Sequence, residues 1–238
     1  MKCVLVTGGS RGIGRECVRE FTRLGYKVAF TYLNSKNEAE ELSRDTGAIA
    51  IRADSAVEAD ILSAVKTARN ELGAIDVLIN NAAISSFSLF TDLTLQDWND
   101  TFAVSVTGAF LYTRECAREM IGNKQGRIIN ISSMWGLVGS SCEVHYSAAK
   151  AALIGMTKAL AKELGPSNIT VNAIAPGVIN TDMNSALSKE DIDSLCEETP
   201  LGRVGEPIEI ARAAAYLASD DAAFITGAVL NVNGGMVI

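Results

Sequence analysis

The chain has 238 residues, a length that suits a single α/β domain. Its 21 Lys and Arg residues against 28 Asp and Glu residues give a net charge of −7, which argues against general binding to nucleic acids or anionic membranes. Hydrophobic residues make up 48% of the chain, and 20 glycines against 4 prolines provide for a large core with many tight turns, which excludes a disordered protein.

The cysteines and the apolar segments indicate the cellular compartment. The 5 cysteines are scattered and have no CxxC spacing, so we predict neither a disulfide framework nor a metal site. The apolar run in MKCVLVTGG is too short for a signal peptide or a membrane span, and no later stretch approaches the roughly 18 apolar residues that a span needs. We therefore expect a cytoplasmic protein of one domain, residues 1–238, that binds neither membranes nor nucleic acid.

Short apolar runs alternate with amphipathic stretches along the chain. The runs predict strands at Cys3 to Val6, Val28 to Tyr32, Ala48 to Ile51, Val77 to Ile79, Ile128 to Ile131, Val171 to Ile174 and Val229 to Val232. The stretches predict helices at Gly12 to Leu24, Lys36 to Asp45, Glu58 to Leu72, Gln96 to Met120 and Ser147 to Leu164. This alternation predicts an α/β fold with a parallel sheet of about seven strands and helices on both faces.

A glycine-rich segment, Thr7-Gly8-Gly9-Ser10-Arg11-Gly12-Ile13-Gly14, follows the first predicted strand and opens the first predicted helix. Glycines allow a sharp turn and bring backbone N–H groups against a pyrophosphate, while the helix N-terminus favours anionic charge. The alternative is a tight turn that serves packing alone. The position of the glycine-rich segment at the start of a strand-helix-strand unit favours a dinucleotide site.

Tyr146 and Lys150 are four residues apart, so in a helix they share one face. A free tyrosine holds its proton until about pH 10, and a neighbouring Lys⁺ is expected to lower that pKa by stabilising the phenolate. The YxxxK spacing alone is common in amphipathic helices. Ser133 strengthens the prediction of a catalytic site because it follows a predicted strand, at the carboxyl end where such sheets present ligands.

Residues 180–207 break the alternation of strands and helices. They are polar and acidic, and they lie before the final helical stretch. We interpret this segment as a substrate lid, and a surface helical excursion is the alternative.

Five motifs occur in order and span essentially the whole chain. They are the TGxxxGIG turn, Asn80-Asn81-Ala82-Ala83 after the fourth predicted strand, Ser133, Tyr146-Ser-Ala-Ala-Lys150, and Pro176-Gly177. Together they resemble the motif set of the short-chain dehydrogenase/reductase family. The resemblance implies a three-layer, doubly wound Rossmann-type fold, a nicotinamide cofactor, and hydride transfer to or from a carbonyl.

The resemblance also implies roles for these residues. Ser133 hydrogen-bonds the substrate carbonyl, Tyr146 is the general acid, and Lys150 reaches the cofactor's ribose hydroxyls. Ser132 is the adjacent competitor, but neighbouring strand residues point in opposite directions and the family pattern selects Ser133. The predicted cofactor contacts are Gly8, Ser10, Arg11, Gly12, Ile13, Gly14, Tyr32, Asn34, Ser35, Asp54, Asn81, Ala82, Tyr146, Lys150, Pro176, Gly177, Ile179 and Thr181.

NADP(H) is the predicted cofactor. NAD-specific sites place an Asp or Glu at the end of the second strand, where it accepts from the ribose 2′-hydroxyl. This chain has Thr31-Tyr32-Leu33-Asn34-Ser35-Lys36 there, with no carboxylate to repel a 2′-phosphate, and Arg11 lies in the glycine-rich turn. Alternatively, Arg11 is a solvated residue at the helix start.

Two residues depart from the family pattern. Ser105 stands where relatives usually have an asparagine, the fourth member of the catalytic set, at a helix irregularity whose main-chain carbonyl holds a water. Every residue has a main-chain carbonyl that can hold the water, and serine also competes for backbone hydrogen bonds in helices. We therefore predict that the protein keeps its activity, at the usual level or a reduced one. Ala83 stands where relatives usually have a glycine, which adds a methyl group near the cofactor.

Among family members, the sequence most resembles bacterial 3-oxoacyl-[acyl-carrier-protein] reductases, which implies acyl carrier protein as a partner. Arg118, Lys124 and Lys158 are candidates for a basic docking patch. The segment from Met134 to Tyr146 resembles reductases of the 5-aminopentanone group on elongation factor P, in which case Glu143 would attract the amine.

A third hypothesis is an NADP-binding regulatory or scaffold protein without turnover. The intact Ser133, Tyr146 and Lys150 argue against it. Because relatives are commonly tetramers, we expect a homotetramer built through the helices at 96 to 120 and 147 to 164.

Overall fold

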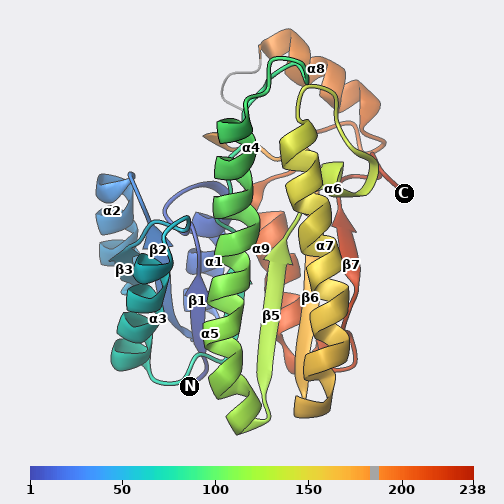
Figure 1. Ribbon diagram of the computed structural model, residues 1–238. Helices are drawn as coiled ribbons and strands as arrows, with labels where there is room; N and C mark the ends of the chain where they lie inside the picture. The colour runs from blue at the N-terminus through green and yellow to red at the C-terminus, as the bar shows by residue number, and fades with distance from the viewer. Residues whose placement is uncertain (183–187) are drawn as a thin grey trace.

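The protein is described by a computed structural model, which covers residues 1–182 and 188–238 (Figure 1). In these residues seven parallel strands form one sheet in the order β3-β2-β1-β4-β5-β6-β7. The strands are β1 (Cys3–Val6), β2 (Lys27–Tyr32), β3 (Ile49–Arg52), β4 (Val77–Asn80), β5 (Gly126–Ile131), β6 (Ile169–Pro176) and β7 (Val229–Val232). This arrangement confirms the predicted parallel sheet.

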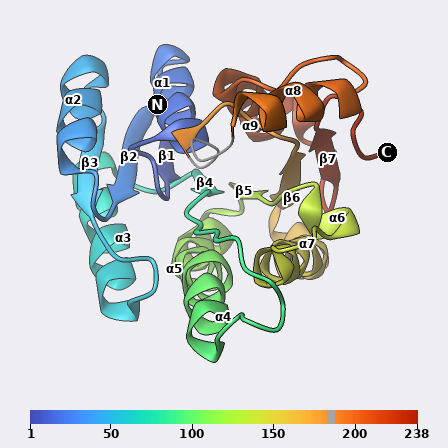
Figure 2. The same ribbon diagram turned by 90° about the horizontal axis from the view of Figure 1, so that it is seen from above.

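Helices cover both faces of the sheet and make three layers. They are α1 (Gly12–Arg23), α2 (Lys36–Thr46), α3 (Glu58–Leu72), α4 (Leu95–Phe102), α5 (Gly108–Asn123), α6 (Trp135–Val138), α7 (Val144–Leu164), α8 (Lys189–Glu198) and α9 (Pro207–Ala218). In Figure 2, α1, α2 and α9 lie on one side of the sheet, and α3, α5 and α7 lie on the other. None of the described helices is long and apolar enough to cross a membrane.

Each strand contributes to both layers of the core because successive side chains point to opposite faces. In β1, Val4 and Val6 belong to the same buried cluster as Phe21 of α1, whereas Leu5 belongs to the cluster that contains Ile61 of α3. Burial of strands on both faces is the reason that they appear in the sequence as short continuous apolar runs.

The strand order changes direction at β1, which lies between β2 and β4. Loops that leave the carboxyl ends of β1 and β4 therefore diverge, and in such folds ligands bind in the crevice between them. The segments at this edge, here called the catalytic edge, are residues 7–12, 81–94, 132–134 and 177–182.

Three details differ from the predicted elements. The helix predicted at Gln96 to Met120 is divided into α4 and α5 by a π-helix, Ala103–Thr107. Helix α7 begins at Val144 and so includes Tyr146 in its first turn. The predicted lid, residues 180–207, contains α8, while its residues 183–187 lie outside the described residues.

Candidate active site

The glycine-rich turn between β1 and α1 requires its glycines for close approach. Gly8 has φ of +65° and Gly12 has φ of +52°, which side chains rarely adopt. A Cβ atom at Gly14 would lie 2.2 Å from the Gly8 carbonyl oxygen. The residue before the first turn of α1 is Arg11, whose side chain makes no capping hydrogen bond, and an uncapped helix N-terminus favours an anion.

Asn81 holds this turn in place from the end of β4. Its side-chain Nδ2 donates to the carbonyl oxygens of Thr7 (3.0 Å) and Gly8 (2.9 Å). The backbone N–H groups of Asn81 and Ala82 both donate to Thr7 Oγ1. The predicted cofactor residues Asn81 and Ala82 therefore lie directly against the phosphate-binding turn.

The end of β2 lies beside the same turn. The Gly9 N–H donates to the Thr31 carbonyl at 2.8 Å, which places the carboxyl end of β2 next to the glycines. Arg11 is largely exposed, and its guanidinium lies 3.9 Å from Asp182. Of the predicted cofactor contacts, Tyr32 directly follows Thr31 at this strand end, and the contacts of Asn34 and Ser35 stay predictions.

Arg52 is a cation near this segment that the sequence analysis missed. It lies opposite Tyr32 in the β2–β3 register, and its Nε donates to the Leu33 carbonyl at 3.2 Å. Parallel pairing of the second and third predicted strands would have revealed Arg52, because it brings the ends of the two strands together. An exposed guanidinium at this position favours a 2′-phosphate on the bound nucleotide.

Asp54 follows β3 and shapes the loop that leads into α3. Its Oδ1 accepts from the Ala56 N–H at 2.8 Å, and its own N–H donates to Asp60 Oδ2 at 3.0 Å. The carboxylate thus holds the turn of its own loop, and its contact with the adenine stays a prediction.

Ser132 and Ser133 have different partners at the end of β5. The Ser132 hydroxyl is buried and donates to the Lys150 carbonyl at 2.9 Å. Ser133 Oγ accepts from the Trp135 N–H at 3.1 Å, and its hydroxyl lies near enough to the Tyr146 phenol to lower the pKa of that phenol. Ser133 is therefore the serine that lies beside Tyr146, and its contact with a substrate carbonyl stays a prediction.

Tyr146 and Lys150 lie on one face of α7, as their spacing predicts. Lys150 is 2% exposed, and its Nζ donates to the Ile131 carbonyl at 2.7 Å. The same Nζ lies 5.5 Å from the centroid of the Tyr146 ring. The amine and the phenol ring are thus neighbours above the end of β5.

The protein's own groups do not lower the pKa of Tyr146, contrary to expectation. This pKa is raised to about 12, chiefly by burial and then by the charge of Glu143, and the interaction with the Ser133 hydroxyl opposes the rise only in part. Burial lowers the pKa of Lys150 to about 8. The expected lowering of the Tyr146 pKa by Lys150 is absent because Lys150 Nζ hydrogen-bonds a main-chain carbonyl and lies over the phenol ring.

The segment after β6 closes the crevice on its far side. A Cβ atom at Gly177 would lie 2.8 Å from Asn233 Cα, so this turn also requires a glycine. A Cβ atom at Gly12 would lie 3.2 Å from Thr181 Cγ2, which shows that Thr181 packs beside the glycine-rich turn. A cavity of about 490 Å³ lies between this segment and α8, and its lining includes Ile179 and Ile192. Of the residues predicted after β6, Thr181 is thus beside the turn and Ile179 lines the cavity.

Comparison with known proteins gives a consistent answer. Residues 8–237 match the family described as enoyl-(acyl carrier protein) reductase. The chain is 43% identical over 240 residues to the 3-oxoacyl-[acyl-carrier-protein] reductase FabG of Aquifex aeolicus, with 99% of this chain and 97% of the relative covered. It is 42% identical over 240 residues to the 3-oxoacyl-[acyl-carrier-protein] reductase of a Synechocystis species, with 98% and 96% covered.

Solved structures agree with these relatives. A mutant short-chain dehydrogenase/reductase from Serratia marcescens has a TM-score of 0.93 at 39% identity, with 99% of this chain and 97% of that chain covered. A blue fluorescent protein from a metagenomic library, in complex with NADPH, has a TM-score of 0.94 at 40% identity, with 100% and 98% covered. The chain belongs to the short-chain dehydrogenase/reductase family. The expected family, the Rossmann-type fold and the class of oxidoreductase acting on a carbonyl or hydroxyl group are thereby confirmed.

In this short-chain dehydrogenase/reductase, Ser105 lies in the middle of the π-helix. The Gly108 N–H bonds the carbonyl of Ala103, five residues earlier, in place of the usual four. Ser105 is 1% exposed, and in the described part of the chain its Oγ has no hydrogen-bond partner. The helix irregularity that the resemblance implied at this position is therefore present with a serine.

Proposed function

We propose that this chain is an NADPH-dependent carbonyl reductase that transfers a hydride to a ketone, with a 3-oxoacyl group on acyl carrier protein as its substrate. The observation that carries the reaction type is the arrangement of Ser133, Tyr146 and Lys150 beside a glycine-rich turn at one edge of the sheet. The names of the relatives that are 40 to 43% identical over the full chain support the carrier-bound substrate.

The residues of the crevice fit a phosphorylated dinucleotide. The glycine-rich turn and the start of α1 would hold the pyrophosphate, and Arg11 and Arg52 would hold the 2′-phosphate. NADPH, when bound, supplies the hydride that reduces the carbonyl carbon.

Tyr146 protonates the carbonyl oxygen as it gains negative charge. With a pKa of about 12, the phenol is protonated at neutral pH, which is the form that a general acid needs. Ser133 would hold the same oxygen by hydrogen bonding, because its hydroxyl lies near enough to the phenol to influence the pKa of Tyr146. Both groups therefore converge on one substrate atom.

Lys150 supplies positive charge behind the phenol. Its amine is buried and held by the Ile131 carbonyl, so its position is fixed before substrate arrives. In the substrate-free structure burial keeps the pKa of Tyr146 raised despite this charge, so Lys150 would act on the phenolate that forms as Tyr146 gives up its proton. Lys150 therefore helps the reaction in the step where the tyrosine loses its proton.

A panel of ketones tests the substrate. We expect purified protein to oxidise NADPH with acetoacetyl thioesters, and with a 3-oxoacyl carrier protein at a higher kcat/KM than with simple aliphatic ketones. NADPH oxidation with aliphatic ketones alone would contradict the carrier-bound substrate. No oxidation with any ketone would favour the NADP-binding scaffold.

One observation favours a second candidate, the reductase of 5-aminopentanone on elongation factor P. Glu143 is 7% exposed, and its charge acts on Tyr146. None of the ion pairs in the described residues involves Glu143. A buried carboxylate without a cation favours an amine in the substrate. Turnover of the modified factor in the same panel, above that of the thioesters, would select this candidate.

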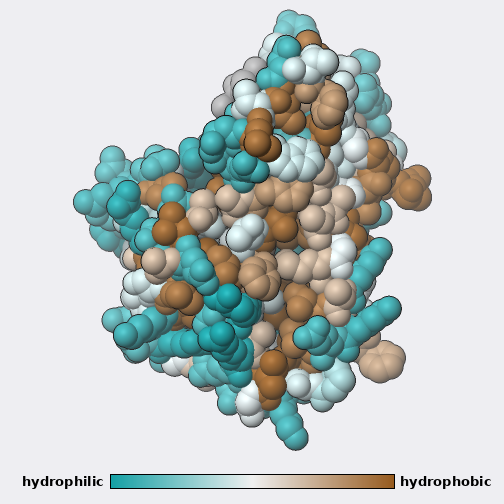
Figure 3. All heavy atoms as spheres, in the orientation of Figure 1, coloured by the Kyte–Doolittle hydropathy of each residue, from teal (hydrophilic) through white to brown (hydrophobic). Residues whose placement is uncertain are grey.

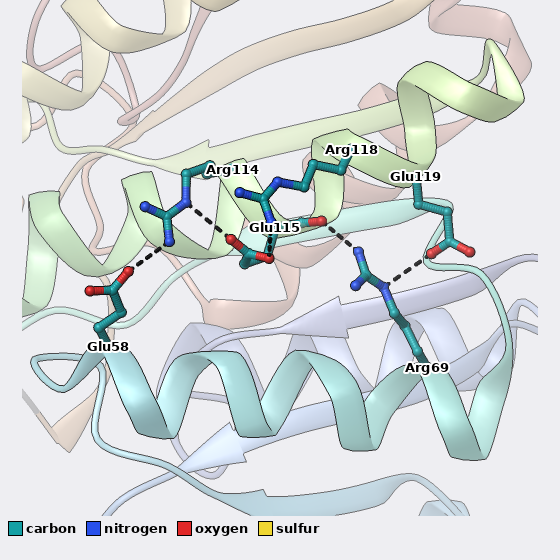
Figure 4. A network of polar contacts seen from close by, with 6 residues as sticks. All are labelled: Glu58, Arg69, Arg114, Glu115, Arg118 and Glu119. Atoms are coloured by element: carbon teal, nitrogen blue, oxygen red, sulfur yellow. Dashed lines mark hydrogen bonds and ion pairs between the residues drawn. The ribbon is translucent and has the colours of Figure 1, made fainter.

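The candidate basic patch is poorly placed for a carrier protein at the catalytic edge. Arg118 forms an ion pair with Glu115 within a network that joins α3 and α5 (Figure 4). Lys124 follows the end of α5 two residues before β5, at the opposite edge of the sheet, and Lys158 lies in the second half of α7. Carrier docking would therefore require other residues than these three.

We further propose that the protein is cytoplasmic and assembles as a homotetramer through α5 and α7. Figure 3 shows hydrophobic residues gathered over these two helices, with hydrophilic residues beside them. Phe110 of α5 is 46% exposed and lies 5.5 Å from the Arg114 guanidinium. Light scattering would check the assembly, and Phe110→Glu is expected to shift it to smaller species.

A further inference from the structure

The β4–α4 loop, residues 81–94, begins at the cofactor-binding turn. Asn81 bonds the carbonyl oxygens of Thr7 and Gly8, which fixes the first residue of the loop to the phosphate cradle. The next residues continue without regular structure as far as the capping box of Thr94 and Asp97 at the start of α4.

Three further bonds hold the middle of this loop against the residues that lead into Tyr146. They are Ser85 Oγ to Glu143 Oε1 (2.7 Å), Ser86 Oγ with His145 Nε2 (3.0 Å), and Ser88 N–H to the Cys142 carbonyl (2.9 Å). Residues 85–88 and 142–145 therefore lie side by side, and the second segment ends one residue before Tyr146.

The loop is held here by polar bonds and not by burial of its apolar side chains. Phe87 is 64% exposed and Phe90 is 69% exposed. The partners on the other segment are buried instead, since Glu143 is 7% exposed and His145 is 0% exposed. Ser85 and Ser86 themselves are partly exposed, so these pairs are part-buried. Such polar pairs carry a desolvation penalty that apolar contacts avoid, but they fix direction and register.

We propose that Ser85 and Ser86 are positioning residues, which hold the β4–α4 loop against the first turn of α7 and so fix Tyr146 relative to the glycine-rich turn. One loop then connects the cradle of the cofactor, through Asn81, to the general acid, through Glu143 and His145. The inference rests on the proposed function, because it concerns the alignment of the proton donor with the hydride donor.

Alignment of this kind has a large effect on rate. Displacement of a reacting group by about 1 Å can lower turnover on the order of 100-fold without removing any catalytic side chain. Loss of the two hydroxyls should therefore reduce kcat and leave NADPH binding unchanged, because the glycine-rich turn keeps its own bonds to Asn81.

The test compares three variants with the wild-type protein. S85A/S86A removes both side-chain bonds, and S85T/S86T keeps both hydroxyl groups. S88A is the matched control, because its hydroxyl bonds only the neighbouring Leu89 carbonyl while the backbone bond to Cys142 remains. We measure kcat and KM with a ketone that the wild type reduces, the Kd for NADPH by fluorescence, and hydrogen exchange of residues 84–90 and 144–149.

We expect S85A/S86A to lower kcat at least tenfold with the NADPH Kd within twofold, and to accelerate exchange in both segments. S88A should stay within twofold of wild type, and S85T/S86T should restore at least half of kcat. Unchanged exchange in S85A/S86A, or faster exchange in the loop with normal kcat, would overturn the proposal. If the double variant does not fold, S86A alone decides by the same criteria.

A wild-type protein that reduces no ketone would instead contradict the proposed function. In that case exchange at residues 144–149, measured without substrate, still decides the positioning role. Acceleration in S85A/S86A with recovery in S85T/S86T would support it, and no acceleration would overturn it.

Discussion

At the scale of single residues, two neighbouring serines at the end of β5 differ in their hydrogen-bond partners. Ser132 donates to the Lys150 carbonyl in the core, whereas Ser133 contacts Tyr146. We expect Ser133→Ala to lower kcat by about 100-fold or more with little change in stability. Ser132→Ala should cost about 1 kcal/mol of stability and affect kcat far less. Measurement of kcat and of thermal unfolding for both variants checks these predictions. A large loss of kcat in Ser132→Ala with little loss in Ser133→Ala would contradict the assignment of Ser133 to the site.

The pH dependence of reduction should follow Lys150. Burial lowers the pKa of Lys150 to about 8, so its ammonium form is lost as the pH rises through 8, while Tyr146 remains protonated because its pKa is about 12. We therefore predict that kcat/KM for ketone reduction falls above about pH 8. In Lys150→Arg, which stays charged, this inflection should vanish whatever its kcat. A flat wild-type profile up to pH 9.5 would contradict the assignment.

Ser105 gives a prediction about both activity and stability. Its Oγ is buried and, within the described residues, has no hydrogen-bond partner. Ser105→Ala should therefore be neutral or stabilising by up to about 1 kcal/mol, since it removes an unsatisfied group. Ser105→Asn is expected to keep kcat at or above the wild-type value. Collapse of kcat in Ser105→Asn would show that the surrounding site is fitted to serine.

At the scale of elements, the glycine-rich turn and α1 form one anion-binding unit. In Gly14→Ala, the new Cβ would lie 2.2 Å from the Gly8 carbonyl oxygen, so the turn must shift. We expect the Kd for NADPH to rise at least tenfold. Gly122→Ala is the control, because its Cβ would meet no atom within 4 Å and alanine favours the helix by about 0.5–1 kcal/mol. Equal NADPH affinity in both variants would argue against this turn as the cradle.

Element boundaries show where sequence patterns succeed and where they stop. The seven predicted strands are present because buried parallel strands leave continuous apolar runs. The residue pattern alone predicts one continuous helix across the π-helix at 103–107, since one extra residue per turn hardly changes an amphipathic pattern over 25 residues, and only the family resemblance implied an irregularity there. The helix α6 is only four residues long, too short to give a periodic signal.

The site shows the same contrast. Motif spacing located Ser133, Tyr146 and Lys150, but their pKa values depend on burial and on main-chain partners such as the Ile131 carbonyl. Arg52 became visible only through the register of β2 and β3. Pairwise geometry of this kind has no local signature in a single sequence.

At the scale of the whole molecule, the sheet brings distant segments to one edge. The loops after β1, β4, β5 and β6 meet there, so a phosphate cradle, a proton donor and a cavity of about 490 Å³ are neighbours. The net charge of −7 makes the local cations at the β2 side important for binding an anionic nucleotide. In the proposed function, the fold thus combines nucleotide binding and proton transfer at one edge of the sheet.

The most direct measurement is NADPH oxidation by Tyr146→Phe, which keeps the ring and removes only the acidic hydroxyl. With a 3-oxoacyl thioester we expect kcat to fall by about 1,000-fold or more, with the NADPH Kd within threefold of the wild type. A kcat within tenfold of wild type would contradict Tyr146 as the proton donor.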